Sequence, residues 1–82
     1  MKNHDALAAL CLELKPSAVS EESRKLVLEQ AMKAGLQLDS DLAVRGSVSE
    51  AQIRDFANHL GAVKVVWKVI AKRVLRKFDI II

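Results

Sequence analysis

The sequence has 82 residues, enough for one domain with a thin hydrophobic core but too few for two domains. Hydrophobic residues make up 51% of it and aromatic residues only 4%, so the core must be built from aliphatic side chains, which suits closely packed helices. The formal net charge is +3, and a single cysteine excludes an internal disulfide.

These features predict an all-α fold: a small compact bundle of four main helices plus a short helical turn, formed by residues 1–82 as a single domain. The sequence contains no apolar stretch followed by small residues, the pattern that would suggest a cleaved signal peptide. The most apolar window, residues 62–82, carries six lysines and arginines, too many for a transmembrane span. We therefore expect a cytoplasmic protein.

The first two helices are marked by their ends. The first should run from about Asp5 to Leu14, with Asn3 or Asp5 as its N-cap. It should end there because Pro16 stops it. The second should follow the hydroxyl cap Ser20 and last to Ala34, where a left-handed Gly35 lets Leu36 fold back onto Ala31. The expected buried faces are Leu7, Leu10, Cys11 and Leu14 in the first helix, and Val27, Leu28, Ala31 and Met32 in the second.

The middle of the chain contains several signals that end one secondary-structure element and begin the next. Residues 36–38 have the pattern of a short extended piece, and Asp39 to Asp41 can cap one or two helical turns through Val44. Ser49 and Gln52 form the strongest start signal in the sequence, a capping box. Inward-facing positions of the helix that follows are Ile53, Phe56, Ala57 and Leu60, and Gly61 should end it.

The pattern of residues 62–78 predicts one long, basic, amphipathic helix. Residues 1–61 contain seven basic and nine acidic side chains, whereas residues 62–82 contain six and one. This asymmetry allows either an exposed anion-binding face or a match between the last helix and the acidic remainder of the chain. The expected core stripe is Val63, Val66, Trp67, Ile70, Ala71, Val74 and Phe78, and the basic stripe is Lys64, Lys68, Lys72 and Arg76.

The spacing of Ala57 and Gly61 resembles a generic helix-turn-helix unit made of helices 53–60 and 62–78. This resemblance implies a regulator of transcription that binds duplex DNA and forms a homodimer. The expected nucleic-acid-binding residues are Lys64, Lys68, Lys72, Arg73, Arg76 and Lys77.

A protein-interaction module is the alternative, an adaptor, inhibitor or antagonist of a larger regulator. Apolar residues at the outward positions Val65 and Val69 suit a protein surface better than base edges. The terminal isoleucines could extend the last helix, dock on the core or pair as an edge strand. The expected partner-binding residues are Val65, Val69, Ile80, Ile81 and Ile82.

The remaining alternatives have less support in the sequence. Binding to a membrane surface would place Trp67 and Phe78 at the lipid interface and remove the largest packing partner of the other helices. His4 and His59 lack neighbours at metal-ligand spacing, and three glycines at helix ends cannot form a phosphate-binding loop. We therefore expect no enzyme activity, no metal and no cofactor.

Overall fold

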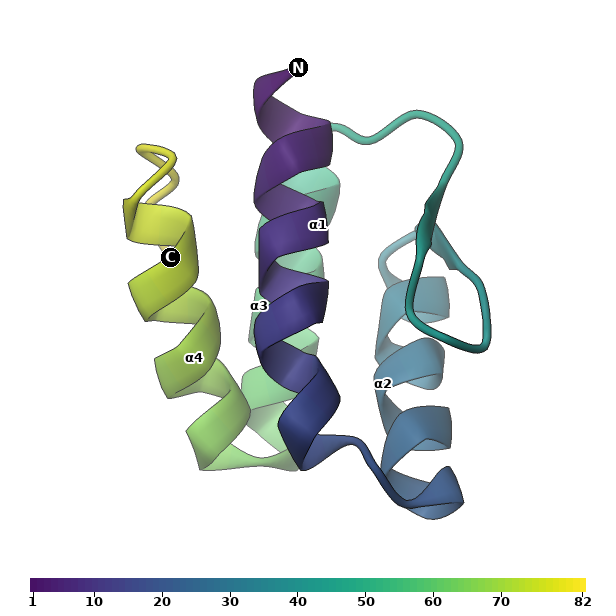
Figure 1. Ribbon diagram of the computed structural model, residues 1–82. Helices are drawn as coiled ribbons and strands as arrows, with labels where there is room; N and C mark the ends of the chain where they lie inside the picture. The colour runs from purple at the N-terminus through teal and green to yellow at the C-terminus, as the bar shows by residue number, and fades with distance from the viewer.

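The computed structural model describes all 82 residues and confirms a helical bundle (Figure 1). Its four helices are α1 (Lys2–Leu14), α2 (Glu21–Lys33), α3 (Glu50–Val63) and α4 (Val65–Arg76). A 3-10 helix, η1 (Lys15–Ser17), follows α1 directly. Strands β1 (Gln37–Leu38) and β2 (Val44–Arg45) pair antiparallel between α2 and α3, with Gln37 opposite Arg45 and Leu38 opposite Val44.

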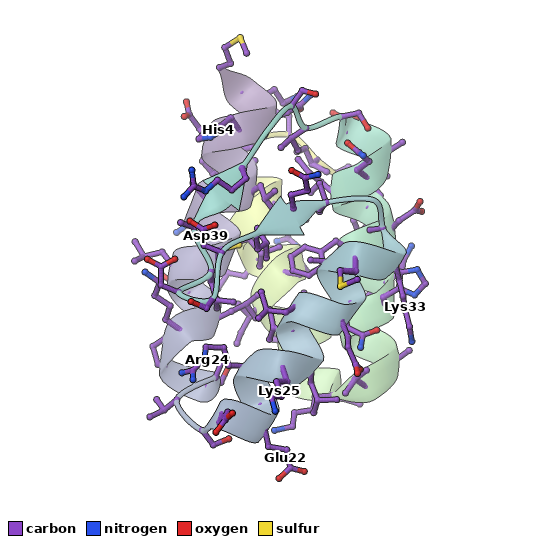
Figure 2. All side chains as sticks on the ribbon, turned by 90° about the vertical axis from the view of Figure 1, so that its right-hand side faces the viewer. His4, Glu22, Arg24, Lys25, Lys33 and Asp39 are labelled. Carbon is purple, nitrogen blue, oxygen red and sulfur yellow. The ribbon has the colours of Figure 1, made fainter.

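The helices α1 and α3 form the centre of the bundle, with α4 on one side of this pair and α2 on the other (Figures 1 and 2). α4 packs against both central helices, whereas α2 packs mainly against α3. One continuous core joins all four helices, and its largest fully buried side chains are Trp67, Phe56, Leu7, Leu10, Leu14, Ile53, Leu60, Leu75 and Ile80. Because no element covers the outer side of α4, this helix presents a free face to solvent (Figure 1).

The predicted ends of α2 and the start of α3 are confirmed. The Ser20 hydroxyl accepts a hydrogen bond from the backbone N–H three residues on, at 3.1 Å. Gly35 has φ 74°, and the Leu36 N–H donates to the Ala31 carbonyl at 2.9 Å, the bond that defines a Schellman motif. At α3, Ser49 and the residue three positions later exchange both hydrogen bonds of a capping box.

Two predictions about the first helices are wrong. α1 begins at Lys2, so neither Asn3 nor Asp5 caps it. Met32 is exposed, and the buried position on α2 is instead Gln30, whose Nε2 donates to the backbone carbonyl one turn back at 3.2 Å. The side-chain amide can be buried there because this bond satisfies one of its N–H groups and neither its nitrogen nor its oxygen is buried without a partner.

The short helix predicted from Asp39 through Val44 is also wrong, since residues 39–43 form the loop of a β-hairpin and Val44 lies in β2. The Leu42 N–H donates to the Asp39 carbonyl at 2.8 Å, and the Asp39 N–H to the Ala43 carbonyl at 2.9 Å. Leu42 has φ 67°, a conformation that glycine normally supplies in such loops. Its buried side chain offsets the strain.

Candidate functional site: the outer face of α4

The helix preceding α4 does not end where the sequence suggests. α3 continues through Gly61 to Val63, and only Lys64 is extended, with φ −141° and ψ 126°. The predictions of a turn at Gly61 and of one helix over residues 62–78 are therefore wrong. α3 and α4 form an antiparallel hairpin with a one-residue link (Figure 1), whereas a helix-turn-helix unit has a turn of three or four residues.

Gly61 allows α3 and α4 to pack closely and does not form a turn between them. A Cβ built on it would lie 2.8 Å from Lys68 Cδ and 2.9 Å from Lys68 Cβ. α4 can therefore approach α3 this closely only because position 61 has no side chain. Lys68 is held in the contact by a second interaction, a hydrogen bond of 2.7 Å from its Nζ to Asn58 Oδ1.

The indole of Trp67 fixes the start of α4 against the end of α1. Trp67 is fully buried, and its Nε1 donates to Ser17 Oγ at 2.9 Å, while the same hydroxyl donates to the Leu14 carbonyl at 2.9 Å. The Lys64 ammonium lies 5.1 Å from the centroid of the indole ring, within the range of a cation–π interaction. Lys64 is thus on the link and beside Trp67, not in line with the basic residues of α4.

The break at Lys64 also changes which residues of α4 face the core. Trp67, Ala71 and Val74 are buried as predicted, and Ile70 and Phe78 are half-buried. Val63 and Val66 are exposed, contrary to the prediction, whereas Leu75 is fully buried. The buried positions of α4 span about 100° of the helix, from Val74 to Leu75 with Trp67 between them, and Val66 points away from this arc.

Three valines make the first half of the outward side of α4 apolar. Val65 is 77% exposed, Val66 53% and Val69 54%. The exposure predicted for Val65 and Val69 is confirmed, and Val66 adds to it.

The second half of the outward side is cationic. Lys72, Arg73, Arg76 and Lys77 are exposed and, with Val69, line a hollow of about 400 Å³. The nearest carboxylate is Glu13 on α1, whose Oε2 lies 4.0 Å from Arg73 Nη2, the limit for an ion pair. Most of this positive charge is therefore uncompensated by the protein itself.

The isoleucine tail docks mainly on the core. Asp79 has φ 60°, its N–H donates to the Arg76 carbonyl, and the Ile80 N–H donates to the Leu75 carbonyl at 3.0 Å, which makes a Schellman motif. Ile80 is only 1% exposed, so its assignment to a partner surface is wrong. Ile82 is half-buried, and the exposed Ile81 is tied by its carbonyl to Arg54 Nε on α3 at 3.2 Å.

Other reactive groups are dispersed over the molecule. No group of three or more His, Cys, Asp or Glu side chains lies close enough to hold a metal ion, and no buried side-chain nitrogen or oxygen lacks a hydrogen-bond partner. Cys11 is buried as predicted, and this burial raises the pKa of its thiol to about 12. No helix has both the length and the apolar character that crossing a membrane requires.

The structure therefore gathers exposed apolar and cationic side chains on one side of the molecule. We define the α4 outer face as Val65, Val66, Val69, Lys72, Arg73, Arg76 and Lys77. Its first half can bury apolar groups and its second half can bind anions. Comparisons with protein-family models, curated proteins and solved structures found no match for the sequence.

Proposed function

We propose that the protein is a small protein-interaction module that binds an acidic, partly apolar segment of another protein on the α4 outer face. The observation that carries this proposal is the presence of three exposed valines and three exposed cations on one side of α4, with a fourth cation, Lys77, at its C-cap, while the opposite side packs against the core. Folding alone does not favour this arrangement, because exposed valines gain nothing from water and neighbouring cations repel each other.

The size of the face indicates a transient interaction. α4 has 12 residues, so its outer face is about 18 Å long and about 10 Å wide. Stable complexes bury roughly 800 Å² on each partner, which is more than one helix face supplies. We therefore expect dissociation constants on the order of micromolar.

Duplex DNA is the second candidate ligand, and the cationic half of the α4 outer face favours it. Phosphates could be contacted by the four cations Lys72, Arg73, Arg76 and Lys77. Such contacts do not require a recognition helix that enters the major groove to read bases. The valines at the start of α4 argue against reading base edges, because that task usually requires polar side chains. A role of this kind would be binding without marked sequence preference.

Salt dependence and two sets of substitutions separate the two ligands. Isotope-labelled protein would be titrated by NMR with an acidic amphipathic peptide and with a short DNA duplex. Four neutralised phosphates give a slope of about −3.6 for log K against log salt, so DNA affinity should fall roughly 150-fold between about 50 and 200 mM salt. Peptide affinity should fall much less, because the valine contacts do not depend on salt.

The valine variant tests the protein-interaction proposal directly. Val65→Ser with Val69→Ser removes apolar contact worth about 2 kcal/mol, so peptide binding should weaken roughly 30-fold while DNA binding is unchanged. Val19→Ser is the control, because Val19 is as exposed as Val65 but lies outside α4. Unchanged peptide affinity in the double variant would refute the proposal.

The charge variant tests the cationic half. Arg76→Glu should weaken both ligands by about 10-fold, or 1.4 kcal/mol. Lys33→Glu is its control, since Lys33 is also a cation in the last turn of a helix but lies on α2, on the far side of the molecule (Figure 2). Equal effects of the two substitutions would show that only net charge matters.

A further inference from the structure

We infer that the partner segment is an amphipathic helix that carries its carboxylates before its apolar residues and lies antiparallel to α4. This inference depends on the proposed function and specifies its ligand.

The spacing on the α4 outer face favours a helical partner. Val65, Val69, Lys72 and Arg76 follow one another at intervals of four, three and four residues. This spacing forms a continuous row along one side of a helix, the pattern with which helices pack against each other. On the inward side, Trp67, Ala71 and Val74 have the same spacing and pack against the central helices. α4 thus carries a second row of side chains at helix-packing spacing, and no other element of the protein covers this row.

The row is divided along its length. Its first two positions are valines and its last two are cations, and Val66 and Arg73 repeat this division beside it. The hollow at the boundary is lined by one valine and four cations, which suits a carboxylate attached to an apolar stem. A complementary helix must therefore be acidic at the end that meets Arg76 and apolar at the end that meets Val65.

The direction of the partner follows from helix electrostatics. Carboxylates stabilise a helix when they lie in its first turn and destabilise it when they lie in its last turn. A segment of three or four turns is only marginally helical in water, so this difference decides how much of it is ready to bind. A helix with carboxylates in its first turn can meet Arg76 with those groups only if it runs opposite to α4.

A second copy of this chain does not satisfy the face. Two antiparallel α4 helices would place Arg76 of each copy against Val65 of the other, removing cations from water without an anion. Two parallel helices would place like charges together. The uncompensated cations favour an acidic partner instead.

The test uses two capped peptides of about 14 residues with identical composition. In the acid-first peptide, glutamates occupy the first half of one helical face and leucines the second half, and the acid-last peptide has these halves exchanged. Binding to the 82-residue protein is measured by NMR titration. A nitroxide label on the first or the last residue of each peptide reports its direction by broadening nearby amide signals.

The acid-first peptide should bind at least about 10-fold more tightly, a difference of about 1.4 kcal/mol. A label on its first residue should broaden Arg73 to Lys77, and a label on its last residue should broaden Val65 and Val66. Equal affinities, or the reverse pattern of broadening, would overturn the inferred direction and leave the proposed function standing. Failure of both peptides to bind would overturn both.

Discussion

Replacing Gly61 by alanine tests the closest contact in the molecule, the one between α3 and α4. Glycine in a helix normally costs up to about 1 kcal/mol relative to alanine, so this substitution would ordinarily stabilise the protein. Here the new Cβ would lie 2.9 Å from Lys68 Cβ, whereas carbon atoms pack best at about 3.5–4.0 Å. Lys68 Cβ cannot rotate away, because its position is fixed by the backbone of α4.

The two helices must therefore separate by roughly 0.6 Å, which affects the packing of Trp67, Phe56 and Leu60 in the core. Overpacking of this kind costs about 1–3 kcal/mol. Gly61 lies in the last turn of α3, where the gain in helix propensity is below its full value. We expect a net loss of about 1 kcal/mol, which lowers the melting temperature by about 4–8 °C in a domain of this size.

Thermal and urea unfolding, followed by circular dichroism and Trp67 fluorescence, would measure this loss. Ala62→Gly is the matched control, because Ala62 is exposed in the same turn and reports the propensity difference without the contact. Adding the two effects gives the cost of overpacking alone. If Gly61→Ala were as stable as the unmodified protein or more so, the close approach of α3 and α4 would be refuted.

Three further predictions concern residues away from the α4 outer face. Ser17→Ala leaves the buried Trp67 N–H without its acceptor and should cost about 1–3 kcal/mol in urea unfolding; no loss would mean that the hydrogen bond contributes nothing. Asp79→Gly removes the strain of a left-handed residue and should raise stability by up to about 1 kcal/mol, whereas Asp79→Ala should not. Burial raises the thiol pKa of Cys11 to about 12 in the folded protein, from 9.0 for an exposed thiol. The unfolded chain therefore loses the thiol proton at lower pH than the folded protein does, so the free energy of unfolding should fall as pH rises from about 9 to 12. At about pH 10 the loss relative to neutral pH should be roughly 1.4 kcal/mol, and it should be missing from Cys11→Ala.

Local signals in the sequence identify the end of α1, both ends of α2 and the start of α3 correctly. The caps at Ser20 and Ser49 and the left-handed Gly35 act within one turn of chain, so the residues that decide them are adjacent in sequence. The inward face of α3 is predicted equally well, because a regular helix repeats its buried positions at a fixed interval.

The errors occur where a distant contact outweighs the local signal. Leu42 adopts a conformation typical of glycine because its side chain is buried, and sequence pattern gives no sign of that burial. Asp79 is the corresponding case at the end of α4, where docking of Ile80 on the core makes up for a left-handed aspartate. The sequence predicts Gly61 to end the helix, but α3 continues through it, and the close contact with Lys68 is the reason for a glycine at this position.

The break at Lys64 has the largest consequence for function. An uninterrupted helix over residues 62–78 would align Lys64, Lys68, Lys72 and Arg76 as a row of cations, which is the basis for expecting DNA. In the structure Lys64 lies beside the ring of Trp67 and Lys68 lies against α3, so both are occupied within the protein. The row left facing solvent begins with Val65 and Val69 and ends with Lys72 and Arg76. Because half of this row is apolar, a polyanion alone would leave its valines in water, whereas an acidic amphipathic helix covers both halves.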